Sequence, residues 1–211
     1  SLGRLEDIAL WYASWQGRVQ PTIKKPQVVI FAGNHGITSQ GVSIFPQEVT
    51  AQMVKNFEAG GAAINQLTDC FGADLDVHAL KLESPTFDFT KGAAMSEADC
   101  VSALHSGWVS VDEKSDLIVT GEMGIGNTTS AAAISLALFG GSGMDWAGQG
   151  TGLNQDGINL KARIVEAGVA ANPTAKGNGL NALMCLGGRE LAAMVGAIAR
   201  ARSLKIPVIL D

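Results

Sequence analysis

A short apolar run that leads through a glycine-rich turn into an alanine-rich segment constrains this fold more than any other feature of the sequence. The run is Asp116–Thr120, the turn is Gly121–Ser130 (Gly-Glu-Met-Gly-Ile-Gly-Asn-Thr-Thr-Ser), and Ala131–Leu138 follows. We expect a strand, a turn and a helix in that order. Backbone N–H groups at the start of such a helix are unpaired and attract anions, phosphate above all. A tight connection that binds no ligand is the alternative that this pattern leaves open.

The residues of the turn suit a ligand site. Gly124 and Gly126 allow a ligand to approach the backbone closely and can take a positive φ. Three donors follow, any of which can cap the helix: Asn127, Thr128 and Thr129. The carboxylate of Glu122 would repel a phosphate beside it, which indicates a role in chemistry or in binding a hydroxyl group. The turn is neither a P-loop nor a dinucleotide fingerprint, because no Gly-Lys-Ser/Thr follows and the glycine spacing differs.

The rest of the chain alternates apolar runs with helical patterns. The expected strands are Gln27–Ala32, Leu75–Leu80, Leu117–Val119 and Val208–Leu210. The expected helices are Leu5–Gln16, Pro46–Leu67 with a break near Gly60-Gly61, Ser96–Gly107 with Ser96 as N-cap, the helix after the glycine turn, Asp156–Ala171, and Asn181–Arg202 with a break at Gly187-Gly188. Such alternation predicts an α/β fold with a parallel sheet, in which the glycine clusters converge on one sheet edge.

Composition and charge exclude several classes of protein. The net charge is −5 with no basic cluster, which gives no support for nucleic-acid binding. No apolar run is long enough to span a membrane, and no signal peptide is visible. The three cysteines are far apart and predict buried thiols in a cytoplasmic protein. No His, Cys, Asp and Glu grouping has the spacing of a metal site, and His78 and His105 are expected to be structural.

The ends of the chain suggest a fragment. The sequence begins with Ser1-Leu-Gly and no methionine. It ends on Lys205–Asp211, an apolar strand pattern whose last residue falls where ligand-binding loops begin in open parallel sheets. We expect a longer protein.

Five further side chains are candidates for a site, each with a structural alternative. His35 follows the first strand and can be a base or a ligand contact, or simply fix the loop by hydrogen bonds. Lys161 can reach an anion, although a lysine on a helix usually faces solvent. Apolar side chains suit a flat aromatic ligand but equally suit a core: Phe45, Met53 and Met123.

Five motifs in order give the chain a family resemblance. They are Phe31–Ile37, Gly41–Thr50, Gly121–Thr129, Gly148–Gly152 and Leu186–Ala197. Together they resemble the nicotinate-nucleotide:dimethylbenzimidazole phosphoribosyltransferases, the CobT family of cobalamin biosynthesis, from the first strand to the last residue.

The resemblance implies a reaction and an architecture. The family moves phosphoribosyl from nicotinate mononucleotide to 5,6-dimethylbenzimidazole, with inversion at C1′, giving nicotinate and α-ribazole 5′-phosphate. No metal or cofactor is implied, and a homodimer is. The implied fold is a Rossmann-like parallel sheet flanked by helices, with a small helical subdomain. We assign residues 1–25 to that subdomain and 26–211 to the α/β nucleotide-binding domain.

The resemblance also implies roles for individual residues. Glu122 and Lys161 correspond to catalytic positions. The phosphate and ribose would be bound by Gly124, Gly126, Asn127, Thr128, Gly150, Thr151, Gly152, Gly187 and Gly188. The base pocket would be formed by Phe45, Met53, Met123 and His35. The general-base glutamate of the family lies in a C-terminal segment beyond this sequence, so it has no counterpart here.

Two other readings stay open. A truncated member of the family can bind a nucleotide or an azole without turning it over. A phosphate-binding enzyme of another class, such as a kinase or a dehydrogenase, is the third reading, and the missing P-loop lysine and dinucleotide fingerprint argue against it.

Overall fold

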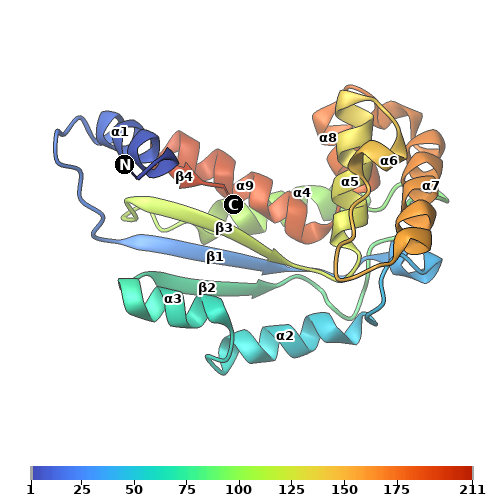
Figure 1. The fold of residues 1–211 in the computed structure, drawn as a ribbon, viewed down its shortest axis with the longest axis horizontal. Helices are drawn as coiled ribbons and strands as arrows, with labels where there is room; N and C mark the ends of the chain where they lie inside the picture. Colours follow the sequence, from blue (N-terminus) through green and yellow to red (C-terminus); the bar gives the residue numbers. More distant parts are fainter. Residues whose placement is uncertain (1, 211) are drawn as a thin grey trace.

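The computed structural model describes residues 2–210 and places a parallel sheet at the centre of the fold (Figure 1). Its strand order is β2-β1-β3-β4, and all three pairings are parallel. The strands are β1 (Pro26–Ala32), β2 (Asp74–Ala79), β3 (Leu117–Met123) and β4 (Val208–Ile209). The predicted α/β class is confirmed. Strand β3 runs farther than expected, because Gly121 to Met123 pair with β1 before the chain turns.

Helices cover both faces of the sheet and form a separate layer beyond the ends of its strands. They are α1 (Arg4–Gln16), α2 (Glu48–Glu58), α3 (Ala63–Phe71), α4 (Glu97–Ser110), α5 (Asn127–Phe139), α6 (Gly143–Trp146), α7 (Gln155–Ala171), α8 (Gly179–Leu186) and α9 (Arg189–Ser203), with 3-10 helices Gly36–Gln40 and Pro173–Ala175. Figure 1 shows α2 and α3 on one side of the sheet, α4 and α9 on the other. The strands point toward α5–α8. The helices predicted from sequence are found within a few residues, whereas α6 was not predicted.

One core lies between the sheet and the α4–α9 pair. Val29 and Phe31 of β1 and Ile118 of β3 pack there against an alanine face of α9. The two helices approach closely, since a Cβ at Gly107 or Gly196 would overlap the backbone of the opposite helix. The predicted N-cap of α4 is confirmed, because Ser96 Oγ accepts a hydrogen bond from the Asp99 N–H at 3.1 Å.

A second core holds the helices beyond the strand ends. Ala133 of α5, Val165 of α7 and Leu186 of α8 are buried in it, together with Phe89 from the loop after β2. This packing fixes the start of α5 and the side chains of α7 at the carboxyl edge of the sheet. It therefore holds the glycine turn at this edge.

Helix α1 lies at the opposite end of the strands from this edge (Figure 1). It is tied to the start of β3, because the Tyr12 hydroxyl donates to the Asp116 carbonyl oxygen at 3.0 Å. The division into residues 1–25 and 26–211 stays a prediction. None of the helices in the described part of the chain is both long and apolar enough to cross a membrane.

Candidate active site

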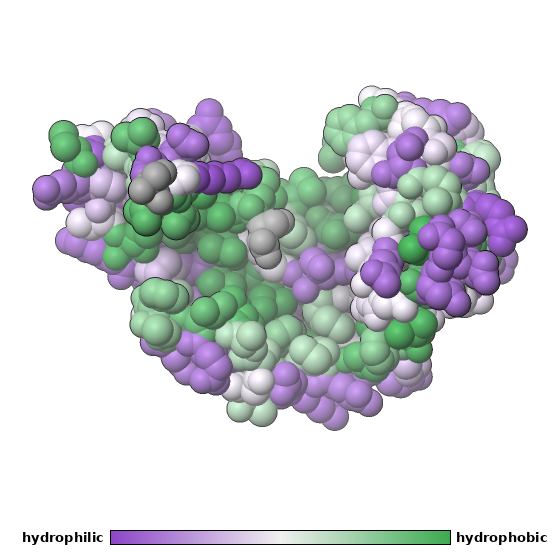
Figure 2. All heavy atoms as spheres, viewed as in Figure 1, coloured by the Kyte–Doolittle hydropathy of each residue, from purple (hydrophilic) through white to green (hydrophobic). Residues whose placement is uncertain are grey.

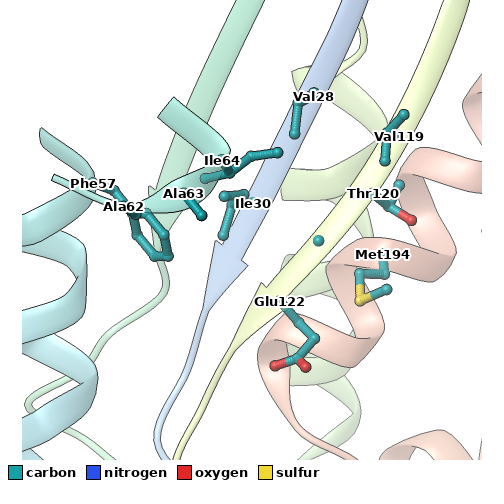
Figure 3. A pocket seen from close by; sticks show the side chains of 11 residues that line it. Val28, Ile30, Phe57, Ala62, Ala63, Ile64, Val119, Thr120, Glu122 and Met194 are labelled. Carbon is teal, nitrogen blue, oxygen red and sulfur yellow. The ribbon is translucent and has the colours of Figure 1, made fainter. Parts of the chain in front are cut away.

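A carboxylate stands at the end of β3, on the rim of a cavity. The cavity has a volume of about 450 Å³ and opens between β1, β3, the α2–α3 connection and α9. Figure 3 shows Glu122 at one end of it, near Met194 of α9. The lining is otherwise apolar apart from Thr120: Val28, Ile30, Phe57, Ala62, Ala63, Ile64, Val119, Gly121 and Met194. The Glu122 side chain is accessible to solvent and accepts a hydrogen bond from Asn127 Nδ2.

The surroundings of Glu122 favour its protonated form. The pKa of Glu122 is raised, first because the surrounding protein displaces part of the water around its carboxyl group and second because the charge of Glu190 lies nearby. The hydrogen bond from Asn127 and the neighbouring His35 act in the opposite direction. Glu122 therefore holds a proton more tightly than an ordinary glutamate does.

Behind Glu122, His35 is buried between two partners. Its Nε2 lies 2.5 Å from Glu190 Oε1, and its Nδ1 lies 3.0 Å from Ser130 Oγ. His35, Ser130 and Glu190 are all fully buried. Both ring nitrogens of His35 thus have partners within the protein. His35, which we predicted for the base pocket, is buried behind the wall of the cavity.

Two glycines make room for Glu190. A Cβ at Gly33 would collide with Glu190 Oε2, and a Cβ at Gly188 would collide with the same carboxylate and with His35. Gly124 is also packed against the His35 ring. The predicted phosphate glycine Gly188 therefore faces a carboxylate. We call His35, Glu122 and Glu190 the acidic cluster.

A buried lysine lies on the other side of the first turn of α5. Lys161 of α7 is 1% exposed, and its Nζ donates to Thr128 Oγ1 at 2.7 Å and to the Gly148 carbonyl oxygen at 3.4 Å. Burial lowers the pKa of Lys161. Within residues 2–210 it forms no ion pair. A buried cation that contacts only neutral oxygens is poorly compensated, and an anion would complete the site.

The second glycine cluster of the sequence borders this lysine. A Cβ at Gly150, whose φ is +55°, would lie 3.3 Å from Thr128 Oγ1 and 3.4 Å from Lys161 Nζ. Thr151 and Gly152 are exposed in the same loop, and Gly152 has a φ of +116°. We call Thr128, Gly150 and Lys161 the lysine cluster.

The start of α5 joins the two clusters and differs from the expected capping. The N-cap position is Gly126 with a φ of +93°, and no side chain caps the helix. Asn127 instead donates to Glu122, while Thr128 accepts from Lys161. The prediction that Asn127, Thr128 or Thr129 caps this helix is therefore wrong. The side chains of Asn127 and Thr128 thus serve the two clusters on either side. The N–H groups of Asn127 and Thr129 donate to the carbonyl oxygens of Gly124 and Gly126 at 3.1 and 3.0 Å.

The other predicted base-pocket residues do not line the cavity described above. Met123 ends β3 beside Glu122 and is partly exposed, as is Met53 on α2. Helix α2 is tied to the glycine turn, since Thr50 Oγ1 accepts from the Ile125 N–H at 3.2 Å. Phe45 is 45% exposed in the loop before α2. Gly187 is buried against Leu183 of α8.

Sequence reasoning missed three residues that organise the site. Glu190 sits in the first turn of α9, where a glutamate ordinarily complements the helix dipole and gives no sign of burial. Ser130 lies among small residues whose sequence pattern predicts only a buried core. Gln47 donates through Nε2 to the His35 carbonyl oxygen at 2.6 Å and fixes that loop. Glu190 is detectable in hindsight as the second of two charged residues, Arg189 and Glu190, that follow the paired glycines of the Leu186–Ala197 motif.

No cluster of three or more His, Cys, Asp or Glu side chains in the described residues is arranged to hold a metal ion.

Comparison with known proteins places the chain in one family. A family model described as phosphoribosyltransferase matches residues 1–211. A nicotinate-nucleotide–dimethylbenzimidazole phosphoribosyltransferase of Jannaschia sp. (strain CCS1) is 62% identical over all 211 residues, and one of Roseobacter denitrificans is 60% identical. The chain spans 63% and 62% of the lengths of these two relatives.

A solved structure shares the fold. The crystal structure of CobT from Thermus thermophilus matches all of this chain and 68% of its own, with a TM-score of 0.87 and 35% identity. A second crystal structure from the same organism, of the nicotinate-nucleotide–dimethylbenzimidazole phosphoribosyltransferase, matches with a TM-score of 0.85 and 32% identity. The chain belongs to the nicotinate-nucleotide–dimethylbenzimidazole phosphoribosyltransferase family.

Proposed function

We propose that the protein to which these residues belong transfers phosphoribosyl from nicotinate mononucleotide to 5,6-dimethylbenzimidazole, giving α-ribazole 5′-phosphate and nicotinate for the nucleotide loop of cobalamin. One observation carries the proposal. A buried, uncompensated lysine and a carboxylate on a cavity rim lie on opposite sides of the same helix start. A nucleotide has the matching shape, with a phosphate at one end and a reactive C1′ at the other.

The phosphate would lie at the lysine cluster. Lys161 supplies the positive charge, and Thr128 and the backbone around Gly150 supply further polar contacts. The positive end of the α5 helix dipole would add to this anion site. The phosphate would in turn compensate the buried ammonium group, so that binding and charge burial assist each other.

The sugar would lie with its C1′ toward Glu122. In the reaction the bond from C1′ to nicotinate breaks, and its electron pair goes to the pyridinium nitrogen, which becomes neutral. The unprotonated ring nitrogen of dimethylbenzimidazole forms the new bond to C1′ from the opposite side, and the proton on the other ring nitrogen passes to a base. Glu122 would stabilise the positive charge that develops on the ribose. The family resemblance assigns the base to a glutamate outside these residues.

The flat base needs an apolar slot beside Glu122. The cavity wall supplies one, with Ile30, Phe57 and Met194. Met123, Met53 and Phe45 remain our candidates for the part of the slot beyond the end of β3, with His35 behind the wall. Such a surface binds neutral heterocycles by burial of apolar area.

A non-catalytic role is the second candidate. The chain spans 63% of the relative from Jannaschia. These residues alone would then bind a nucleotide or an azole without turnover.

Calorimetric titration beside a product assay tests both candidates. The 211-residue chain is titrated with nicotinate mononucleotide and with dimethylbenzimidazole, and α-ribazole 5′-phosphate is measured with this chain and with a protein of the relatives' full length. We expect binding by both proteins, and turnover by the longer one alone. Robust turnover by the shorter chain would promote Glu122 to general base. Absence of nucleotide binding by both proteins would reject the proposed function.

We propose further that the protein is cytoplasmic and homodimeric. An apolar groove of about 580 Å³ between α5, α8 and α9 supports an assembly surface, since Leu180 and Val195 are exposed there (Figure 2 shows the hollowed face of the molecule). Light scattering of the purified protein tests it: a mass of one chain would contradict the dimer.

A further inference from the structure

The acidic cluster contains a buried carboxylate that the proposed reaction does not use. Glu190 is 0% exposed, its Oε1 is bound to His35, and its Oε2 has no hydrogen-bond partner among the described residues. A buried glutamate with an unsatisfied oxygen is costly to the fold. Gly33 and Gly188 lack side chains at the two positions where a Cβ would displace it. The surrounding backbone is thus shaped around this carboxylate.

Helix geometry aims Glu190 toward the candidate reaction centre. Met194 follows Glu190 by four residues on α9, so both lie on one face of the helix. Met194 lines the cavity close to Glu122 in Figure 3. Glu190 therefore lies one turn deeper on the side of α9 that faces Glu122, behind the cavity wall.

The neighbouring elements also tie Glu190 to Glu122. The His35 segment is anchored to the end of β3, because the Gly33 N–H donates to the Met123 carbonyl oxygen at 3.0 Å. Ser130 of α5 binds the other nitrogen of the His35 ring, while Asn127 of the same helix binds Glu122. Movement of the Glu190–His35 pair would therefore change the position of Glu122 through both β3 and α5.

We propose that Glu190 is a positioning residue that acts, together with His35, on the charge and orientation of the Glu122 carboxylate at the cavity. The inference rests on the proposed function only for its consequence in catalysis. Glu190 does not touch the cavity, so it is not a catalytic residue.

The charged groups around Glu122 can be named element by element. Glu190 faces it from α9 and His35 from the loop after β1, and α5 contributes the neutral amide of Asn127. The cavity residues from α2, α3 and their connection are uncharged. Glu190 raises the pKa of Glu122, and His35 lowers it. Removing each group should therefore move the titration of Glu122 in opposite directions.

The test is a carboxyl titration by NMR of the 211-residue chain labelled with ¹³C at the glutamate carboxyl carbon, in which Glu122→Gln identifies the Glu122 signal. We expect a downward shift of the Glu122 midpoint in Glu190→Gln and an upward shift in His35→Gln. Glu113→Gln is the matched control, because Glu113 is exposed and pairs with Arg200 on α9. It should leave the midpoint unchanged.

The outcomes separate this inference from the proposed function. An unchanged Glu122 midpoint in Glu190→Gln, with the fold intact by circular dichroism, overturns the inference. A shift in the same direction in both variants also overturns it, because that indicates general loosening. If Glu190→Gln does not fold, the His35→Gln variant is the deciding test. An upward shift of the Glu122 midpoint in that variant supports the inference, and an unchanged midpoint overturns it. If the titrations behave as expected but a protein of full family length has no transferase activity, the proposed function fails and the inference stands.

The catalytic consequence is a second readout in the full-length protein. Glu122 must be charged to stabilise a cationic ribose, so the acidic limb of the profile of kcat/KM against pH follows its pKa. We expect Glu190→Gln to move that limb to lower pH while leaving nucleotide affinity unchanged. A uniform loss of activity at every pH would contradict a positioning role.

Discussion

The acidic cluster and the lysine cluster lie on either side of one helix start but differ in how their charges are compensated. In the acidic cluster, Glu190 is paired with His35, and Glu122 accepts a hydrogen bond from Asn127. In the lysine cluster, Lys161 contacts only a hydroxyl and a carbonyl oxygen. The first is held in place by the protein itself, as expected for the reaction centre that we propose. The second lacks a counter-charge, as expected for the phosphate site that we propose.

We expect the largest effect when the carboxylate that faces the cavity is removed. In a protein of the relatives' full length, Glu122→Gln should lower the rate of transfer by about 10²–10³-fold, as loss of one preorganised electrostatic group does. The melting temperature should change little, because Glu122 is accessible to solvent. Steady-state kinetics and a thermal melt measure the two effects, with the exposed Glu58→Gln as control. An unchanged catalytic rate would remove Glu122 from the mechanism.

A change in the lysine cluster should reduce the affinity for the nucleotide and not the rate of the chemical step. Lys161→Met should weaken binding of nicotinate mononucleotide by about 10- to 100-fold, the loss expected for a hydrogen-bonded charged group. The riboside without phosphate should bind both proteins equally. Without ligand the variant should be at least as stable as the parent, since a buried uncompensated cation is replaced by an apolar chain.

Titration calorimetry and denaturant unfolding measure these effects, and Lys176→Met, at an exposed lysine, is the control. Equal loss of affinity for the nucleotide and the riboside would place the phosphate elsewhere.

Two glycines test the packing behind the acidic cluster. A Cβ at Gly188 would collide with His35 and Glu190, whereas nothing lies within 4 Å of a Cβ at Gly148. Gly188→Ala should therefore lower the free energy of unfolding by about 1–3 kcal/mol through overpacking. Gly148→Ala should stay within about 0.5 kcal/mol of the parent. Equal unfolding midpoints for the two variants in denaturant would mean that the acidic cluster is loosely packed.

The smallest expected effect is on pH dependence. Burial lowers the folded-state pKa of Lys161, so its charged form is less favoured in the folded than in the unfolded chain. As pH rises through the lowered folded pKa, the ligand-free protein should gain stability relative to Lys161→Met. Phosphate affinity should fall over the same range, because the lysine loses its charge. Unfolding and calorimetric titrations at several pH values measure the two trends, and trends of the same sign would contradict this assignment.

The fold was largely predictable because β1 and β3 contain apolar runs and helices such as α4 begin at a capping residue. Two exceptions have physical causes. Strand β3 continues through Gly121 because pairing with Ile30 of β1 outweighs the turn preference of glycine. Helix α6 is a single turn in a glycine-rich loop, too short to show a periodic pattern. Both depend on tertiary contacts that sequence periodicity does not encode.

The sequence predicted where the candidate site lies in the fold, but not most of the side-chain contacts within it. The glycine clusters meet at one edge, as expected for ends of parallel strands, since Gly124 and Gly188 both pack against His35. Glu190 was missed because burial of a glutamate depends on His35, 155 residues away in sequence. The burial of Lys161 likewise depends on Thr128 of another helix, while its helix position alone suggests a solvent-facing side chain. Long-range pairs of polar residues leave no local pattern.

The central claim is that one nucleotide spans both clusters, and a crystal structure of the chain with nicotinate mononucleotide tests it most directly. The account predicts phosphate oxygens within hydrogen-bond distance of Lys161 Nζ and Thr128 Oγ1, with the ribose C1′ facing Glu122. A phosphate bound away from Lys161, or a ribose turned away from Glu122, would contradict it.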